Sequence, residues 1–323
     1  MQMTLPSTTS KITLANRWDH FLARFRINRS GHRVEPGLYA LGNPAADSPV
    51  FVTANYTLSF DALRSALSGT DGYILVLDTG GINVWCAAGK GTFGTGELVK
   101  RIAASSLGEV VHHRRLILPQ LGAAGVAAHE VRKRSGFKAE YGPVRAADLK
   151  KFLETGKVTP EMRRVTFTLS DRVVLIPVEL VGVMLPMLVL AVALYFLGGL
   201  WTSLAGISAI LAGVVLFPVF LPWLPTRDFS TKGFVLGALV MAVLFLAQVS
   251  RGEANAVLWQ QIGRGLSYVL IWSPVTAFVA LNFTGSTTFT SKTGVRREMY
   301  RYLRLMAGIL IAGVILSIAL NLL

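Results

Sequence analysis

The residue best suited to chemistry is Cys86, the only cysteine among 323 residues. It follows Trp85 and precedes Lys90 by four positions, within the segment GINVWCAAGKGTFGTG, residues 81–96. A nearby ammonium group favours the thiolate form of cysteine, and a thiolate is a nucleophile and a soft metal ligand. A free cysteine is also often a small buried apolar residue. The sulfur is therefore either packed in a core or offered to a ligand, and the small residues after it suit a flat, bulky ligand.

The glycines after Cys86 form a second candidate site. Gly89, Gly91 and Gly94 match GxGxxG, which binds dinucleotide phosphates when it connects a strand to a helix. The acidic residue expected at the end of the next strand is missing, because RRLILPQ ends in Gln120. A P-loop is excluded as well, since Lys90 is followed by glycine instead of Ser or Thr. The weaker prediction that remains is a phosphate held by backbone amides at a helix start.

Strands are expected to alternate with helices on both sides of Cys86. Apolar runs predict strands near 49–56, 72–78, 114–120 and 138–143, and helical spacing predicts helices near 60–69, 96–105, 125–136 and 146–156. This alternation is typical of a parallel sheet covered on both faces, so residues 46–156 are expected to form a Rossmann-like α/β domain. Ligands bind beyond the carboxyl ends of such strands, where Thr53, Asp78 and the glycine-rich segment fall. Residues 82–85 themselves have a strand-like pattern.

Basic segments flank this predicted domain. Residues 1–45 include Arg24, Arg26, Arg29 and Arg33, and we interpret them as a solvated basic arm in preference to a phosphate or lipid contact. Residues 157–172 are expected to form a basic linker. The net charge of +14 would suit nucleic acid. However, many basic residues flank apolar segments, where membrane topology requires them, so no nucleic-acid partner is expected.

The remaining residues, 173–323, are expected to form an all-α transmembrane domain. Five apolar segments are each long enough to cross about 30 Å of hydrocarbon. They lie near 173–197, 201–224, 231–249, 256–281 and 303–323. Basic residues gather in alternate connectors, so the positive-inside rule places the α/β domain in the cytoplasm and the C-terminus outside. The sequence therefore predicts a multi-pass protein of the cytoplasmic membrane, with lipid as a partner.

A family resemblance is carried by Asn83-Val84-Trp85-Cys86-Ala87-Ala88-Gly89-Lys90. This string resembles the cap-helix motif N(V/I)WCA(A/G)GK of the HgcA family, the bacterial and archaeal corrinoid proteins of mercury methylation. The segments LPQLGAAGVAAHEV (118–131), YGPVRAADL (141–149) and NFTGSTTFTS (282–291) also look like that family. The family's soluble domain is similar to the corrinoid-binding domain of the corrinoid iron–sulfur protein. The resemblance implies that residues 83–90 form a short helix capping a cobalamin-type corrinoid, that Cys86 is the lower axial ligand of its cobalt, and that Thr53 lies near the corrin.

The same resemblance implies a corrinoid-dependent methyltransferase that passes a methyl group from Cys-ligated methylcobalt to Hg(II), giving methylmercury. Because Hg(II) is an electrophile, the methyl group must leave with electrons, and a thiolate opposite to it favours that polarity. The cobalt must then be reduced again. One cysteine cannot hold an iron–sulfur cluster, so a separate ferredoxin-like 4Fe–4S protein, HgcB in the family, is implied as reductant.

The implied methyl donor is a methyl-folate, acting through a methyltransferase. Two alternatives stay open. One is a corrinoid methyl carrier with another physiological acceptor. The other is a membrane transporter with a nucleotide-binding regulatory domain.

Overall fold

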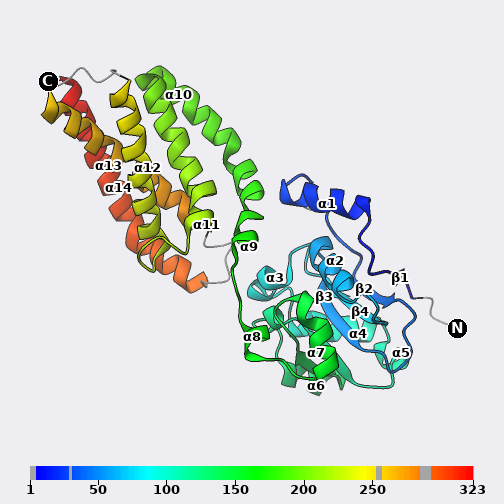
Figure 1. Ribbon diagram of the computed structural model, residues 1–323. Coiled ribbons are helices and arrows are strands. Elements are labelled where there is room, and N and C mark those ends of the chain that lie inside the picture. Colours follow the sequence, from blue (N-terminus) through cyan, green and yellow to red (C-terminus); the bar gives the residue numbers. More distant parts are fainter. Residues whose placement is uncertain (1–4, 29–30, 252–256, 284–291, 323) are drawn as a thin grey trace. The chain divides into compact units, whose positions relative to one another are not determined.

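The computed structural model describes residues 5–28, 31–251, 257–283 and 292–322, and it divides into two compact units, Met1–Thr166 and Phe167–Leu323 (Figure 1). The first unit is built on a six-stranded sheet with the order β1-β2-β4-β3-β5-β6. Its strands are β1 (Ser7–Thr8), β2 (Gly37–Leu41), β3 (Val50–Ala54), β4 (Gly72–Leu77), β5 (Arg115–Leu118) and β6 (Lys138–Tyr141). Each unit is described separately below.

The sheet is mixed, whereas the sequence pattern predicted parallel strands alone. Strands β4, β3, β5 and β6 run parallel, but β2 pairs antiparallel with β4 through five residue pairs. The difference arises in residues 1–45, which the sequence analysis assigned to a basic arm. The short apolar run of β2 buries Leu38 and Leu41 and so extends the sheet beyond β4.

Helices cover both faces of the sheet, as the alternation of strands and helices predicted. On one face Val52 packs in a cluster with Leu98 of α4 (Thr95–Ala104) and Val131 of α6 (Ala128–Ser135). On the other face Phe51 packs with Phe60 of α2 (Thr57–Ala66), beside α7 (Leu149–Thr155). Successive strand residues point to opposite faces, so one strand serves both clusters. The remaining elements of this unit are α1 (Leu14–Arg24), α3 (Val84–Lys90), α5 (Leu107–Val110), η1 (Gln120–Gly122), η2 (Ala146–Asp148) and α8 (Pro160–Arg163).

The connections of the parallel strands diverge at β3. The chain passes from β3 through α2 to β4 on one side, and from β4 through α3, α4 and α5 to β5 on the other side. Where neighbouring connections leave a parallel sheet in opposite directions, a crevice forms beyond the carboxyl ends of the strands. The topology therefore marks the carboxyl ends of β3 and β5 as the place for a ligand.

The second unit is helical. Among the residues that the structure describes, four helices are long and apolar enough to cross a membrane: Leu169–Phe220, Phe229–Ser250, Leu258–Phe283 and Thr293–Leu322. Their elements are α9 (Leu169–Val173), α10 (Ile176–Leu211), η3 (Ala212–Leu216), α11 (Phe217–Phe220), α12 (Phe229–Ser250), α13 (Leu258–Phe283) and α14 (Lys292–Leu322). The first residue of the predicted span 256–281 and the last of 303–323 lie outside the described residues, as does most of the NFTGSTTFTS segment, from residue 284 to residue 291.

The first of these helices is interrupted at Gly199, whose φ of 76° and ψ of −172° are not helical. The Ser203 hydroxyl donates to the Ala191 carbonyl across 2.8 Å, although the two residues are 12 positions apart. A continuous helix would separate them by about 18 Å along its axis. The two halves of α10 therefore fold back on each other, as the ribbon near its label shows (Figure 1). The reversal falls where the sequence placed its first connector between spans.

Small residues bring the neighbouring helices α12 and α13 together. A Cβ added to Gly233 would lie 2.6 Å from the Cα of Ala277, and one added to Gly237 would lie 2.8 Å from the Cα of Ser273. Such close backbone approach is the usual basis of helix association within lipid. The amino end of α12 is capped by α14, since the Glu298 carboxylate accepts the backbone amides of Phe229 and Ser230 at 3.2 and 3.1 Å.

Candidate functional site

Cys86 lies on the short helix α3, Val84–Lys90, so the strand-like prediction for residues 82–85 was wrong. Asn83 is the N-cap, and its side-chain oxygen accepts the backbone amide of Cys86 across 2.9 Å. The helix ends at Gly91, which adopts a left-handed conformation with φ 87°. Seven residues make only two turns, too few for hydrophobic spacing to separate a helix from a strand. The cap and the glycine stop were the local signals for a helix.

The two sides of α3 differ in burial. Val84, Ala87 and Ala88 face the core and expose 8%, 0% and 5% of their surface. Trp85 and Cys86 are half-buried, while Gly89 and Lys90 are exposed. The helix therefore fixes itself through small apolar side chains and presents the sulfur on its outer side. Cys86 and Lys90 are four residues apart, so they lie on the same side of the helix.

Gly89 has no structural reason to be glycine within the described part of the chain. A Cβ added there would meet no described atom within 4 Å. Glycine inside a helix costs roughly 0.5–1 kcal/mol relative to alanine. With no side chain at Gly89, the outer side of the helix is flat beside Cys86, and its backbone is exposed next to the sulfur.

Two glycines in the segment after β5, Gly122 and Gly125, are required by packing. A Cβ on Gly125 would collide with the Phe93 carbonyl oxygen and lie 3.0 Å from the Cα of Ala88. A Cβ on Gly122, at the end of η1, would lie 2.6 Å from the ring of Phe93. Phe93 itself is fully buried. The loop after β5 thus packs directly against α3 and the turn after it, which places α3 at the carboxyl end of β5 where the topology predicted a crevice.

A buried amide fixes the loop before α3. Asn55, directly after β3, exposes 3% of its surface, and its side-chain oxygen accepts the backbone amides of Thr79 and Gly81, each at 3.0 Å. The Thr79 hydroxyl lies 2.9 Å from the same oxygen. The amide nitrogen of Asn55 lies 3.4 Å from an oxygen of Asp78. One side chain therefore ties the end of β3 to the loop between β4 and α3.

Sequence reasoning did not single out Asn55 or Thr79. Asn55 was visible only as a polar residue after an apolar run, and its partners are more than 20 positions away. Thr53, which the resemblance places near the corrin, is 3% exposed in β3. Val52 and Ala54 belong to the cluster that includes Ala87 of α3, so the Thr53 side chain points to the opposite face of the sheet. The structure thus unites residues 83–90 in one element and leaves Thr53 on the far face of a neighbouring strand.

The GxGxxG run does not have the setting of a dinucleotide site, because it connects helix α3 to helix α4. At the start of α4 the Thr95 amide donates to the Gly125 carbonyl across 3.2 Å. Glu97 lies in the first turn, and its carboxylate accepts the Asp78 amide across 3.0 Å. A carboxylate at that end repels a phosphate. The arrangement therefore does not favour the phosphate site that the glycine spacing indicated.

Comparisons with known proteins match the first unit. Residues 25–153 match the family model of CdhD, the CO dehydrogenase/acetyl-CoA synthase delta subunit. This part of the chain is similar to the CdhD family. The acetyl-CoA decarbonylase/synthase complex subunit gamma of Methanopyrus kandleri is 37% identical over 129 residues, which are 39% of this chain and 27% of the relative. The corrinoid/iron-sulfur protein large subunit of Moorella thermoacetica is 29% identical over 122 residues, which are 37% of this chain and 27% of the relative.

The chain spans about a quarter of the length of these curated relatives, 27% in each. The CdhD-like region ends at residue 153, before the helical unit begins. It includes every residue of α3 and the strands that position α3. The similarity to a corrinoid/iron–sulfur protein subunit fits the resemblance to corrinoid proteins that the motif at residues 83–90 indicated.

At the carboxyl ends of the sheet strands, Tyr141 ends β6, and its hydroxyl donates to the Val126 carbonyl. Burial raises the pKa of Tyr141. Beside it, Glu140 pairs with Arg115 and Lys138, each at 2.8 Å, and the hydrogen bond from Arg115 holds the pKa of Glu140 below its usual value. Among the described residues no three His, Cys, Asp or Glu side chains gather in a metal-binding group. A metal bound at Cys86 would therefore have this sulfur as its one ligand from the described residues.

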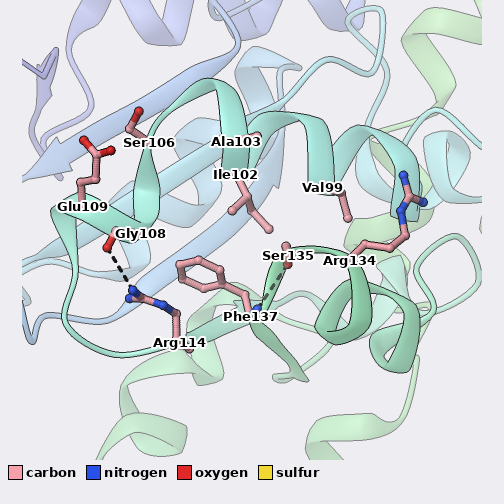
Figure 2. Close-up of a pocket in the computed structure, with 10 residues that line it drawn as sticks. All are labelled: Val99, Ile102, Ala103, Ser106, Gly108, Glu109, Arg114, Arg134, Ser135 and Phe137. Carbon is pink, nitrogen blue, oxygen red and sulfur yellow. Dashed lines mark hydrogen bonds between the residues drawn. The ribbon is translucent and has the colours of Figure 1, made fainter.

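A shallow cavity of about 430 Å³ lies near the amino ends of the sheet strands, between α4, α5 and α6 (Figure 2). Its floor includes Phe137, and Arg114 points across it to the Gly108 carbonyl at 3.1 Å. Arg114 and Phe137 directly precede β5 and β6, at the amino ends of those strands. The cavity is therefore separate from the α3 site, which lies at the carboxyl ends.

Proposed function

We propose that this chain is a membrane-anchored, corrinoid-dependent methyltransferase that uses Cys86 as a cobalt ligand and passes a methyl group to Hg(II). The observation that carries the proposal is the placement of a half-exposed sulfur on the outer side of a helix fixed at the carboxyl edge of the sheet. The similarity of the surrounding domain to a corrinoid/iron–sulfur protein large subunit supports it. The eight-residue cap motif, residues 83–90, supports the choice of mercury as acceptor.

The residues of α3 fit a corrinoid. A corrin is a flat macrocycle, and the outer side of α3 is flat at Gly89 and carries one soft donor, Cys86. Residues 83–90 would hold the ring, with the sulfur of Cys86 as the protein's cobalt ligand. Thr53, which the resemblance also implies, would have to act from the opposite face of β3. When bound, the corrinoid supplies a methyl group carried on cobalt.

The protein's own residues position and tune that ligand. Asn83 holds the backbone of Cys86, while Val84 and Ala87 fasten the helix to the core. Lys90 lies one turn along, on the same side of α3 as the sulfur. A thiolate donates electron density to its metal, and the axial ligand is a principal means by which a protein tunes a metal cofactor. With a corrinoid held at Cys86, such donation would favour release of the methyl group with its electron pair to an electrophile such as Hg(II).

The proposal includes partners. With one cysteine in the chain, the electrons that restore the cofactor come from a separate ferredoxin-like protein of the HgcB type. The methyl donor is a methyl-folate acting through a methyltransferase. The reversal at Gly199 divides the first apolar helix, which supports five crossings of the cytoplasmic membrane. The basic connectors are the reason to propose that the α/β unit lies in the cytoplasm and the C-terminus outside.

The test is purification under anoxic conditions with cobalamin supplied, followed by a visible spectrum and a methylation assay with Hg(II), a methyl donor and a reducing ferredoxin. The wild-type chain should show a sulfur-ligated, base-off cobalt spectrum and form methylmercury. Cys86→Ala should lose that spectrum and abolish product while still inserting in the membrane. Undiminished product from Cys86→Ala would remove the mechanism.

The same experiment separates the competing functions. A corrinoid carrier with another acceptor would give the sulfur-ligated spectrum but no methylmercury under any of these conditions. A transporter with a nucleotide-binding regulatory domain would purify colourless and without cobalt. The setting of the GxGxxG run between two helices counts against that second alternative.

A further inference from the structure

Helix α1 carries its apolar residues on one side. Leu14, Trp18, Phe21 and Phe25 recur at spacings of four, three and four residues, which places them along a single side of the helix and its C-cap. Leu14, Trp18 and Phe21 expose 82%, 62% and 44% of their surface. The rings of Trp18 and Phe21 stack with centroids 5.3 Å apart, and Phe25 continues the row. We call this row the apolar face of α1. It lies on the surface of the first unit.

The polar side of α1 points towards the protein, the reverse of the usual arrangement of an amphipathic helix on a soluble domain. The ring of His20 lies 2.8 Å from a carboxylate oxygen of Asp61, which is 2% exposed. The side-chain oxygen of Asn16 accepts from Arg64, across 3.0 Å, and Arg64 is 5% exposed. Asp61 and Arg64 belong to α2, beside which α1 lies (Figure 1).

Further contacts fix the rotation of α1 about its axis. Asp19 lies 2.7 Å from the ring of His32, which is 4% exposed and also contacts the Ile27 carbonyl at 2.7 Å. Thr13 and Asn16 form a capping box at the amino end. A buried polar group that loses its hydrogen-bond partner is destabilising, so these contacts resist separation. The helix is thereby held with its aromatic side facing outward.

Cations border the apolar face. Segment 11–27 contains four basic residues and one carboxylate, Asp19, which His32 engages. The four are all exposed: Lys11, Arg17, Arg24 and Arg26. A helix with Trp, Phe and Leu on one side and Lys or Arg around it is typical of binding in the plane of an anionic bilayer surface. The described part of the chain also has four helices apolar enough to cross a membrane, so a bilayer is a large apolar phase to which the same protein is suited.

We propose that α1 is an interfacial helix that inserts Leu14, Trp18, Phe21 and Phe25 into an anionic lipid surface, with Arg17 and Arg24 on the lipid phosphates. The inference is independent of the corrinoid and of Hg(II). It replaces the interpretation of residues 1–45 as a solvated basic arm. It also accounts for a buried polar network, Asp61 with Arg64 and His20, whose effect is to keep aromatic residues facing outward.

The test uses the full chain in a Cys86→Ala background, with a nitroxide attached at Trp18→Cys or, separately, at Phe21→Cys. Asn43→Cys, on an exposed loop of the same unit, is the water-facing control, and Leu246→Cys, 65% exposed on α12, is the lipid-facing control. Each protein is reconstituted in phosphatidylcholine vesicles with and without phosphatidylglycerol. Accessibility of the nitroxide to oxygen and to a water-soluble nickel chelate is then measured.

Labels at positions 18 and 21 should resemble the Leu246 control in the anionic vesicles, with high oxygen and low nickel access. Arg17→Gln with Arg24→Gln should lower the equilibrium constant for immersion by about 25-fold, since each cation near an anionic surface contributes about fivefold. Nickel access equal to that of Asn43 would overturn the proposal. So would protection from both reagents, which would mean that protein covers the face, or immersion that is unaffected by phosphatidylglycerol.

Discussion

The backbone amide of Cys86 lies 2.9 Å from the side-chain oxygen of Asn83, so the residue that starts the helix also fixes the residue that carries the sulfur. N-cap residues satisfy one of the amides that a helix leaves without partners in its first turn. Here the amide served is that of the proposed ligand itself. The first position of the NVWC string therefore has a structural role that can be tested apart from its neighbours.

Asn83→Ala should lower the stability of α3 by about 0.5–2 kcal/mol, because the Cys86 amide loses its acceptor. Hydrogen exchange of the α3 amides in the full chain should accelerate accordingly, and cobalamin retention should fall. Asn83→Ser retains an oxygen at the cap and should behave nearly as the wild type. Equal exchange rates in the Ala and Ser variants would show that the cap does not hold the helix.

Gly89→Ala should separate stability from ligand binding. The added methyl group meets open space, so α3 should gain about 0.5–1 kcal/mol through helix propensity. The same methyl group would stand between the backbone and a flat ligand, so cobalamin retention should drop several-fold. Gly96→Ala in α4, also in open space, is the matched control and should leave retention unchanged. Full retention in Gly89→Ala would exclude this side of α3 from the ligand.

Asn55→Ala should be strongly destabilising. It removes the acceptor of the buried Thr79 amide and of the part-buried Gly81 amide. Each unsatisfied buried group costs about 1–3 kcal/mol, so a loss of up to about 6 kcal/mol is expected for the two. The thermal midpoint of the full chain in detergent, followed by near-ultraviolet circular dichroism, measures the loss. Asn43→Ala removes an exposed asparagine from the same unit and should have little effect. Similar midpoints for the two variants would contradict the importance of the Asn55 amide.

Glu140 predicts a pH dependence. Arg115 lowers the pKa of Glu140 in the folded chain, so the pairing stabilises the fold above the ordinary carboxyl value of 4.5 and is lost as pH falls through the lowered pKa. Glu140→Gln should cost about 0.2–1 kcal/mol at neutral pH, the range for a partly exposed pair. Thermal midpoints of the two proteins should converge as the pH falls below the lowered pKa of Glu140. Glu154→Gln, an exposed change on α7, serves as control, and a gap that persists in acid would count against the ion pair.

Gly199→Ala tests the reversal within α10. The φ of 76° and ψ of −172° lie in a region that only glycine enters readily, and a side chain there costs on the order of 1–3 kcal/mol. The yield of monodisperse full chain in detergent and its thermal midpoint should both fall. Gly308→Ala on α14 meets open space in the described structure and should be tolerated. Equal yields from both variants would indicate that the chain does not need its turn at Gly199.

The strands and helices between residues 49 and 156 could be predicted because local pattern and final environment agree there. All six residues of β4 are buried, and its apolar run is continuous. Gly136 and Gly156 end helices in left-handed conformations, as their positions after helical runs suggested. The Gly198–Gly199 pair likewise marked the point where the apolar helix reverses.

The elements that could not be predicted depend on contacts distant in sequence. The orientation of α1 is set by Asp61 and Arg64, about 40 to 50 residues away, so the row of apolar residues alone did not reveal which side faces out. β2 joins the sheet only because β4 lies beside it. The Asn55 bonds join segments separated by more than 20 residues. At α3 the helix is too short for spacing to be decisive, and the motif resemblance indicated the helix that the structure contains.

The single thiol at position 86 makes the native chain a ready-labelled probe. Any maleimide or iodoacetamide that couples to the full protein adds its mass at one known position, so intact-mass spectrometry yields a site occupancy without mutagenesis. Because the sulfur is half-buried on the outer side of its helix, alkylation rates measured with and without added small molecules would rank candidate occupants by protection. Such footprinting works on crude membranes, where optical spectra are obscured.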